Sequence, residues 1–366
     1  MTAAELNGTL RVFHLFDIAE AIDLSRLHEL FGTRPSRREP AFRHPAPEYV
    51  RFERPPVMEP LDATRTNDGL AVSPRVRYFE YGVASVELQL AFSGTWQELV
   101  LFASRWISSS ELEGRAHTLL RERIALILPA LRKPYEAWIN EDYYIVQINP
   151  IAAGDTEVCS AEELLREHGA EIAQIVRGDR ARLSKGEQQD VLQSSMSYYS
   201  TDLLVAGWVA AFVYDTPSGA LATLDLLEYA NTQLLEFRYY DDVLTRLLAE
   251  VYQRLERRRG FWSRWRLARE AESLNTIRLD IREVSELTDN AIKFLSDMFY
   301  ARVYRLAANR IGVIDYHNLV EEKLRTAGDL YDSMVNEFHQ GRAFVLELMV
   351  VVILLIEIVL VIRGKG

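Results

Sequence analysis

The spacing of hydrophobic residues changes once along the chain, near residue 215. Before that point, short apolar runs alternate between strand-like and helix-like spacing. Val86, Leu88 and Leu90, for example, alternate with polar residues, which is typical of a strand with one buried face. This region is predicted to form a mixed α/β head domain, residues 1–215. Its expected strands are 10–18, 76–81, 83–92 and 203–214, with a hairpin over 135–148 that turns at 140–142, and its expected helices are 24–31, 96–108, 112–131, 161–176 and 185–194.

A proline-rich segment, residues 33–74, interrupts the head. It holds eight of the twelve prolines of the chain, with arginines interleaved among them. Proline lacks the N–H group that a sheet ladder requires. We therefore expect an irregular wrapping segment with at most one edge strand, residues 49–53.

After Pro217 the apolar residues follow steps of three and four, which is the spacing of helices that pack along a seam. Three such seams are visible: 244–255, 274–298 and 320–338. The breaks between them fall at Gly260 and Gly312. We therefore predict an α+β protein whose head is followed by a long antiparallel, coiled-coil-like helical stalk, residues 216–342.

The last apolar segment, residues 343–362, reads AFVLELMVVVILLIEIVLVI. Twenty helical residues rise about 30 Å, the thickness of the hydrocarbon core of a bilayer, so the segment is predicted as one C-terminal transmembrane helix. A buried core helix is the alternative. Only four residues follow, which indicates a tail anchor. The first twenty residues lack the pattern of a signal peptide, so we expect the bulk of the chain on the cytoplasmic side.

Two acidic residues lie within this segment. Glu347 is close enough to the boundary to reach water, whereas Glu357 stands between Ile356 and Ile358 and would be unfavourable against lipid. Glu357 is therefore either part of a polar ring, in an ion path or an assembly contact, or a residue that reaches water at the far interface. The sequence does not decide between these interpretations.

The tip of the stalk, residues 254–269, is the most basic stretch of the chain. If the stalk helices run up, down and up again, this tip lies on the same side as the C-terminal helix. Tryptophan and arginine favour the headgroup region of a bilayer, so we predict a contact with anionic lipid; RNA binding and a solvated loop are the alternatives. The residues expected at this membrane interface are Arg257, Arg258, Arg259, Phe261, Trp262, Arg264, Trp265 and Arg266.

Composition and motifs argue against catalysis. The 366 residues are 48% apolar, which suffices for folded domains, and carry a formal charge of −11, which does not favour DNA as a partner. Cys159 is the single cysteine, the seven histidines are scattered, and the HExxH, GxGxxG, GxxxxGK[ST] and GxSxG motifs are absent. We therefore expect no enzyme, no cofactor and no metal site.

Carboxylates gather near the start of the second half of the chain. Glu228, Glu236, Asp241 and Asp242 surround Arg238 at spacings of two to ten residues. Such a pattern predicts an ion-paired helix face, which is far commoner than a catalytic arrangement.

Two stretches of the sequence resemble a known family. AGWVAAFVYDTPSGA followed by LLEYANTQLLEFRYYDD, and the closing helix that begins NRIGVIDYHNLVEEKL, are similar to the DUF155 proteins, whose yeast and human members are mitochondrial inner-membrane proteins named for required meiotic nuclear division. The resemblance implies an Ile-Glu pair in the C-terminal membrane helix, matched by Ile356 and Glu357, no enzymatic activity, and a role in supporting translation. Since the chain shows no transit peptide, it implies a bacterial inner-membrane relative, with the ribosome or RNA as a candidate partner.

Two functions follow from these features. The favoured one is a membrane-anchored, non-enzymatic, homo-oligomeric scaffold or tether, whose cytoplasmic head binds an unidentified partner. The alternative is an oligomeric ion channel or transporter with Glu357 lining the path. The stalk is similar to that of the CorA magnesium channels, although the GMN motif and a second spanning helix are absent.

Overall fold

The structure is a computed structural model that divides into two compact units. Unit 1 comprises residues 1–238 and 288–316, and unit 2 comprises residues 239–287 and 317–366. The residues that the structure describes are 5–32, 55–152, 158–256, 279 and 298–363, apart from the side chains of 254–256, 334–348 and 355–363.

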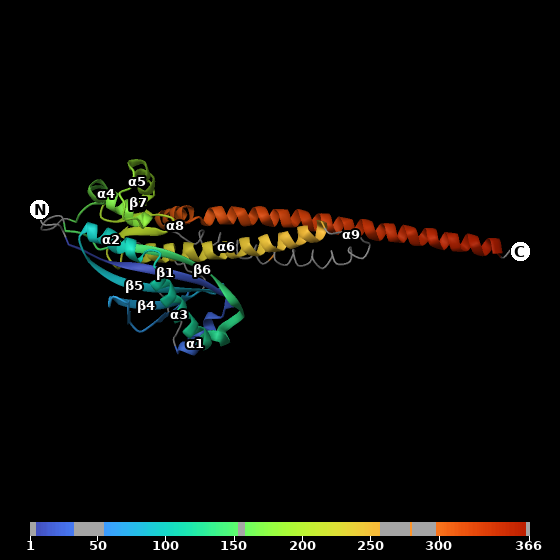
Figure 1. Cartoon of the computed structure of the whole chain (residues 1–366), viewed down its shortest axis with the longest axis horizontal. Coiled ribbons are helices and arrows are strands. Elements are labelled where there is room, and N and C mark those ends of the chain that lie inside the picture. Colours follow the sequence, from blue (N-terminus) through green and yellow to red (C-terminus); the bar gives the residue numbers. More distant parts are fainter. Residues whose placement is uncertain (1–4, 33–54, 153–157, 257–278, 280–297, 364–366) are drawn as a thin grey trace. The chain divides into compact units, whose positions relative to one another are not determined.

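Unit 1 is built on a mixed sheet (Figure 1). Its described strands pair in the order β2-β4-β5-β1-β6-β9-β8-β7, with β3 beside β4. The pair β6–β9 is parallel, and the other described pairs are antiparallel. The strands are β1 (Leu6–Ile22), β2 (Val57–Pro60), β3 (Thr64–Arg65), β4 (Ala71–Tyr78), β5 (Val83–Gly94), β6 (Leu131–Ile148), β7 (Ser195–Met196), β8 (Leu203–Ala206) and β9 (Ala210–Tyr214).

Helices cover this sheet and continue beyond it. Those described are α1 (Leu24–Phe31), α2 (Trp96–Trp106), α3 (Ser110–Ile127), the short 3-10 helix η1 (Leu128–Ala130), α4 (Ala161–Arg177), α5 (Lys185–Leu192), α6 (Leu221–Glu256), α8 (Met298–Ile311) and α9 (Val313–Arg363). Their starts follow local chemistry: Asp23 caps α1, and Thr95 and Ser160 form capping boxes at α2 and α4, so side-chain oxygens satisfy N–H groups that the helix leaves open.

The 17-residue strand β1 organises the core, because it pairs along most of its length with both β5 and β6. Alternate residues of β1, such as Leu10 and Val12, join the main apolar core on one face of the sheet. Leu99 of α2, Leu112 of α3 and Leu164 of α4 belong to the same core. The faces of these helices therefore follow from their apolar spacing, as the sequence predicts.

Most elements expected of the head are confirmed, but the expected hairpin over 135–148 is wrong. These residues belong to the single strand β6. Residues 140–142, read as a turn because they are polar, continue the ladder with residues 14–16 of β1. Their long antiparallel partner, rather than their own propensity, keeps them extended.

The strand expected over 203–214 is also wrong, since the segment forms the hairpin β8–β9. The turn falls at Gly207, whose N–H donates to the carbonyl oxygen of Ala210 at 2.9 Å. A Cβ at residue 207 would lie 2.8 Å from that same oxygen and 2.4 Å from Val176. Glycine is the residue that such a close approach requires.

Two further differences concern the loops. In the proline-rich segment, β2, β3 and the start of β4 form between residues 57 and 74, which is more strand than expected, while the expected edge strand at 49–53 lies outside the described residues. The expected break at Gly312 is confirmed: its φ of +95° lies in the left-handed region that glycine favours, between α8 and α9.

The transmembrane helix predicted for residues 343–362 is wrong, and with it the tail anchor and the placement in a bacterial inner membrane. Among the described residues, no helix is both long enough and apolar enough to cross a bilayer. In this part of α9 the described side chains, 349–354, are apolar.

Unit 2 contains a helix pair made by the second part of α6 and by α9. Leu248 and Val251 of α6 pack with Ala327 of α9 in a small apolar cluster. Beside it, the ammonium group of Lys323 donates to Asp241 at 2.5 Å and to Thr245 at 2.6 Å. Residues spaced by three and four thus supply the apolar contacts of this pair, as the seam pattern predicts.

Candidate functional site

The face of the sheet that meets α6 carries polar side chains, which is unusual for a buried surface. On β5, Ala84, Val86 and Leu88 face the main core, while Ser85 and Glu87 point the other way and are fully buried. Charged residues of β1, β4 and α6 join them. We call this set the polar layer, and it consists of Arg11, Asp17, Arg75, Arg77, Glu87, Asp225, Glu228 and Glu236.

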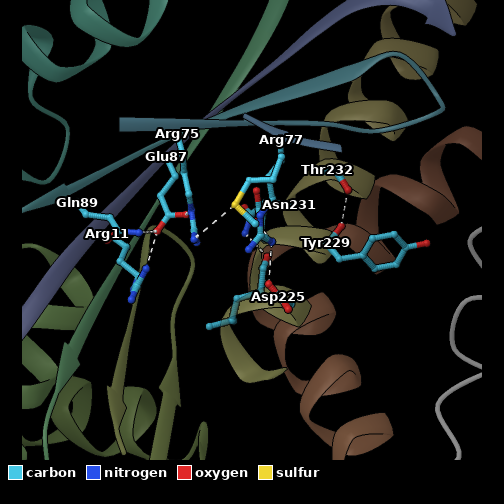
Figure 2. Close-up of polar contacts among 12 residues, drawn as sticks. Arg11, Arg75, Arg77, Glu87, Gln89, Asp225, Tyr229, Asn231 and Thr232 are labelled. Atoms are coloured by element: carbon cyan, nitrogen blue, oxygen red, sulfur yellow. Dashed lines mark hydrogen bonds and ion pairs between the residues drawn. The ribbon is translucent and has the colours of Figure 1, made fainter. Parts of the chain in front are cut away.

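Within the polar layer, Glu87 is the common partner of Arg11 and Arg75, as Figure 2 shows. Its carboxylate accepts from Arg11 at 2.7 Å and from Gln89 at 2.8 Å, and it is also paired with Arg75. Burial alone would raise the pKa of Glu87, but Arg75 and Arg11 outweigh it and lower that pKa. Glu87 is therefore ionised at neutral pH.

Arg77 connects the sheet to α6 (Figure 2). Its guanidinium group donates to Asp225 at 2.7 Å and to Glu228 at 2.5 Å. Burial opposes the charge of Arg77, yet Glu228 and Asp225 raise its pKa further. Burial raises the pKa of Glu228 while Arg77 opposes that shift; we take Glu228 as ionised, because a permanently charged guanidinium group is in direct contact with it.

A second pair of carboxyl groups in the polar layer is Asp17 and Glu236, which are also buried. Asp17 is 2% exposed and Glu236 is 5% exposed. Burial raises the pKa of Asp17 to about 8, and burial together with the nearby charge of Asp17 raises the pKa of Glu236. At neutral pH we expect both to be protonated. Close by, the hydroxyl groups of Tyr81 and Thr232 share a hydrogen bond of 2.7 Å, which joins the turn between β4 and β5 to α6.

The arrangement of charges defines what the polar layer can do. Three arginines, Arg11, Arg75 and Arg77, are paired with three acidic side chains, Glu87, Asp225 and Glu228, so the formal charges balance. Matched and buried groups of this kind fix one packing of a helix on a sheet. The polar layer therefore fixes the first part of α6 on the sheet in a single orientation.

The Asp17–Glu236 pair gives a pH dependence whose sign follows from the raised pKa values. For Asp17, both the folded and the unfolded chain hold the proton below about pH 4, and between about pH 4 and 8 only the folded chain does, so stability falls as pH rises, by up to about 1.4 kcal/mol per pH unit. The raised pKa of Glu236 acts in the same direction. Asp17→Asn should make this fall shallower. The measurement is urea denaturation at pH 5, 6, 7 and 8, with Asp62→Asn, an exposed aspartate, as control. Equal slopes for the Asp17 variant and the unchanged chain would show that Asp17 is not protonated in the fold.

The structure does not describe the side chains of the interface and intramembrane residues that the sequence analysis expected. The basic tip, Arg257 to Arg266, falls outside the described residues, so its contacts stay a prediction. Glu347 and Glu357 belong to the backbone of α9, but their side chains are likewise not described.

The carboxylates near the start of α6 do not form the ion-paired face expected around Arg238. Glu228 pairs with Arg77 and Glu236 is buried, while Arg238 pairs with Glu141 of β6. Asp241 is the partner of Lys323 within unit 2. Asp17, Glu87 and Arg77 were not predicted as site residues. Glu87, like Ser85, alternates with apolar residues in the pattern of a solvent-facing strand residue. The available signal was the spacing of Glu228, Asn231 and Thr232 on one helix turn, opposite polar strand residues.

Two side chains of unit 1 that could react, Cys159 and His14, are held in less reactive states. Cys159 is half-buried, and burial raises the pKa of its thiol, so the thiolate is disfavoured. Burial lowers the pKa of His14 to about 4, so His14 is neutral. Among the described residues, no three His, Cys, Asp or Glu side chains come together in a way that could hold a metal ion.

Helix α9 of unit 2 carries a further feature, an exposed apolar run. Six consecutive side chains, from Met349 to Leu354, are each between 45% and 57% exposed. Six successive residues cover the whole circumference of a helix. We call Met349–Leu354 the apolar run, and its size makes it a candidate interaction surface.

The fold and its polar layer define a mixed α/β domain with a large sheet, and comparison with known proteins places it in a family. The family described as "Uncharacterized protein MJ0711, N-terminal domain" matches residues 7–220, and since this is more than half of the chain, the chain belongs to it. The matched residues span β1 to β9 and stop at the start of α6.

One curated relative is similar to part of the chain. It is "Uncharacterized protein MJ0711" of Methanocaldococcus jannaschii, which is 20% identical over 208 residues. These residues are 56% of this chain and 63% of the relative, so the chain spans less than two thirds of the relative's length. No solved structure matches the chain.

Proposed function

We propose that this protein is a non-enzymatic scaffold, in which the apolar run of α9 joins copies of the chain and the α/β head binds another molecule. The proposal keeps the homo-oligomeric scaffold expected from the sequence without its membrane anchor. The ion-channel alternative is not proposed again, because it would need a spanning helix from each of several copies, and among the described residues no helix is long and apolar enough to cross a bilayer.

The observation that carries the proposal is the exposure of the apolar run. Transfer of apolar surface out of water contributes roughly 25 cal/mol per Å². Single exposed apolar residues are normal on a protein surface, whereas six in succession on one helix are typical of an interaction site. The same sequence on a second copy supplies a matching partner, as in symmetric helical assemblies.

The head is proposed to bind the partner. The arginines of the polar layer are paired with Glu87, Asp225 and Glu228, which supports a role in fixing α6 rather than in reacting with a substrate. We further propose that the finer relationship is to the DUF155 proteins, which would make a component of the translation machinery the partner. Anionic lipid and RNA stay predictions for the basic tip, but the argument that placed this tip beside lipid depended on the membrane helix. RNA is therefore the partner to test there first.

Cross-linking at the apolar run tests the assembly. In a Cys159→Ser background the chain has no cysteine, so Val351→Cys introduces a single thiol in the middle of the run. Because residue 351 is central, it meets its own copy in parallel and in antiparallel pairing. Treatment with a short bis-maleimide should give a product of twice the 42.1 kDa chain mass on a denaturing gel.

The matched control is Glu322→Cys in the same background, at an exposed position on the same helix. It reports random collision between copies. If Val351→Cys gives no more double-mass product than Glu322→Cys, the apolar run does not join two copies.

A further inference from the structure

His14 lies on β1 and points into the main core. Val12 and Phe16, two residues before and after it, belong to that core, and alternate residues of a strand share a face. The His14 side chain is 1% exposed, and neither of its ring nitrogens has a hydrogen-bond partner among the described residues. Buried polar groups in folded proteins are nearly always hydrogen-bonded. His14 therefore needs a partner that the described residues do not supply.

The protonation state of His14 shows what this partner must do. Burial lowers the pKa of His14 to about 4, although the charge of Asp142 opposes the shift, so the ring is neutral at pH 7. A neutral imidazole has one N–H donor and one nitrogen acceptor. The N–H group requires an acceptor, and neither a metal ion nor an ammonium group can accept a hydrogen bond.

The neighbouring strands place one polar group beside His14. Val86 of β5 and Asp142 of β6 are its register partners on either side. Val86 is apolar, whereas the charge of Asp142 acts on the imidazole without a direct hydrogen bond between them. Directly opposed residues of antiparallel strands have Cβ atoms about 4.5–5.5 Å apart, so Asp142 is within reach of a water-mediated contact.

Tyr144 lies beside this pair, but its hydroxyl group is already engaged. It donates to the Asp142 carboxyl group at 2.5 Å and accepts from the backbone and the side chain of Ser108. A hydroxyl group has one donor and two acceptor positions, so all three are filled. Ser108 is exposed on the loop between α2 and α3. A chain of hydrogen bonds thus leads from the surface at Ser108 to Asp142.

We propose that an ordered water molecule is bound between His14 and Asp142. It accepts a hydrogen bond from the imidazole N–H group and donates one to the Asp142 carboxyl group. Water is a small molecule that both donates and accepts, which suits a site as enclosed as that of His14. The water extends the chain of hydrogen bonds from Asp142 to His14 and joins β1 to β6 through side chains.

This site and the proposed assembly can fail separately, because β1 and β6 belong to unit 1 and the apolar run belongs to unit 2. The experiment is a crystal structure of the full chain, solved at a resolution that shows ordered water. We expect a density peak about 2.7–3.2 Å from a ring nitrogen of His14 and about 2.5–3.0 Å from a carboxyl oxygen of Asp142.

Three outcomes of this experiment would overturn the proposal. The first is the lack of a density peak between His14 and Asp142. The second is a direct hydrogen bond from the His14 N–H group to another group of the protein. The third is a peak with the anomalous scattering of a metal ion.

One substitution and its control test the role of His14 in the same crystals. His14→Leu removes both ring nitrogens, and the peak should be lost. His117→Leu is the matched control, because the ring centroid of His117 is 5.7 Å from that of Phe16 and 5.4 Å from that of Trp138, on the same face of the sheet. The control should keep the peak.

A peak that persists in the His14→Leu variant would show that Asp142 binds the water without His14, which contradicts the proposal. If the His14 variant does not fold, the structure of the unchanged chain decides.

Discussion

Glu87→Gln is expected to lower the free energy of unfolding by about 3 to 5 kcal/mol, the range found when one partner of a buried ion pair is removed. The substitution keeps the shape of the side chain but leaves Arg11 and Arg75 without the charge that they share. Both arginines are mostly buried, with side chains 11% and 20% exposed, so water compensates only in part. The measurement is the midpoint of urea denaturation at pH 7.

Glu162→Gln is the matched control, because Glu162 is exposed on α4. We expect this surface change to stay within about 0.5 kcal/mol. A Glu87 variant that is as stable as the Glu162 variant would mean that the polar layer contributes nothing through its charges.

The second large effect is expected at the apolar run. Val350→Lys combined with Ile353→Lys places two positive charges on one face of α9, since residues three apart are neighbours on a helix. Like charges meeting across an interface cost several kcal/mol, so the assembly should weaken at least about a hundredfold and the measured mass should fall to 42.1 kDa. Size-exclusion chromatography with light scattering measures it.

Leu319→Lys combined with Glu322→Lys provides the same spacing at exposed positions of the same helix, outside the apolar run. This control should leave the mass unchanged. If both double variants lose the assembly, the cause is a general loss of α9 structure and not the apolar run.

Local chemistry was sufficient for much of the fold. Asp23, Thr95 and Ser160 cap the starts of helices, and period-two alternation predicts β5. Both signals can be found in the sequence because they depend on residues that are close along the chain. The errors arise where residues distant in sequence determine the secondary structure. Residues 140–142 are polar enough for a turn, yet their pairing with β1 keeps them in β6. Gly207 is a single glycine among the apolar residues 203–214, yet it allows the turn of β8–β9.

The polar layer could not be predicted for a related reason. Glu87 alternates with apolar residues as a solvent-facing strand residue does, and only the arrival of Arg11, Arg75 and Arg77 from other strands makes its burial favourable. Asp17 likewise lies within an apolar strand, where sequence alone does not show a second carboxyl group.

The C-terminal segment shows the limit of composition as a guide. Its hydrophobicity alone led to the prediction of a membrane helix, whereas among the described residues no helix is both long enough and apolar enough to cross a bilayer. Apolar side chains can be buried in lipid or against a second protein surface, so apolar character alone does not show which of the two they contact.

Sedimentation equilibrium of the unchanged full chain tests the proposed scaffold most directly. The proposal predicts a mass of at least twice 42.1 kDa at high protein concentration, which falls toward 42.1 kDa as the protein is diluted. A mass of 42.1 kDa at every concentration up to about 100 μM, where a weak interface with a dissociation constant in the micromolar range would be filled, would contradict it.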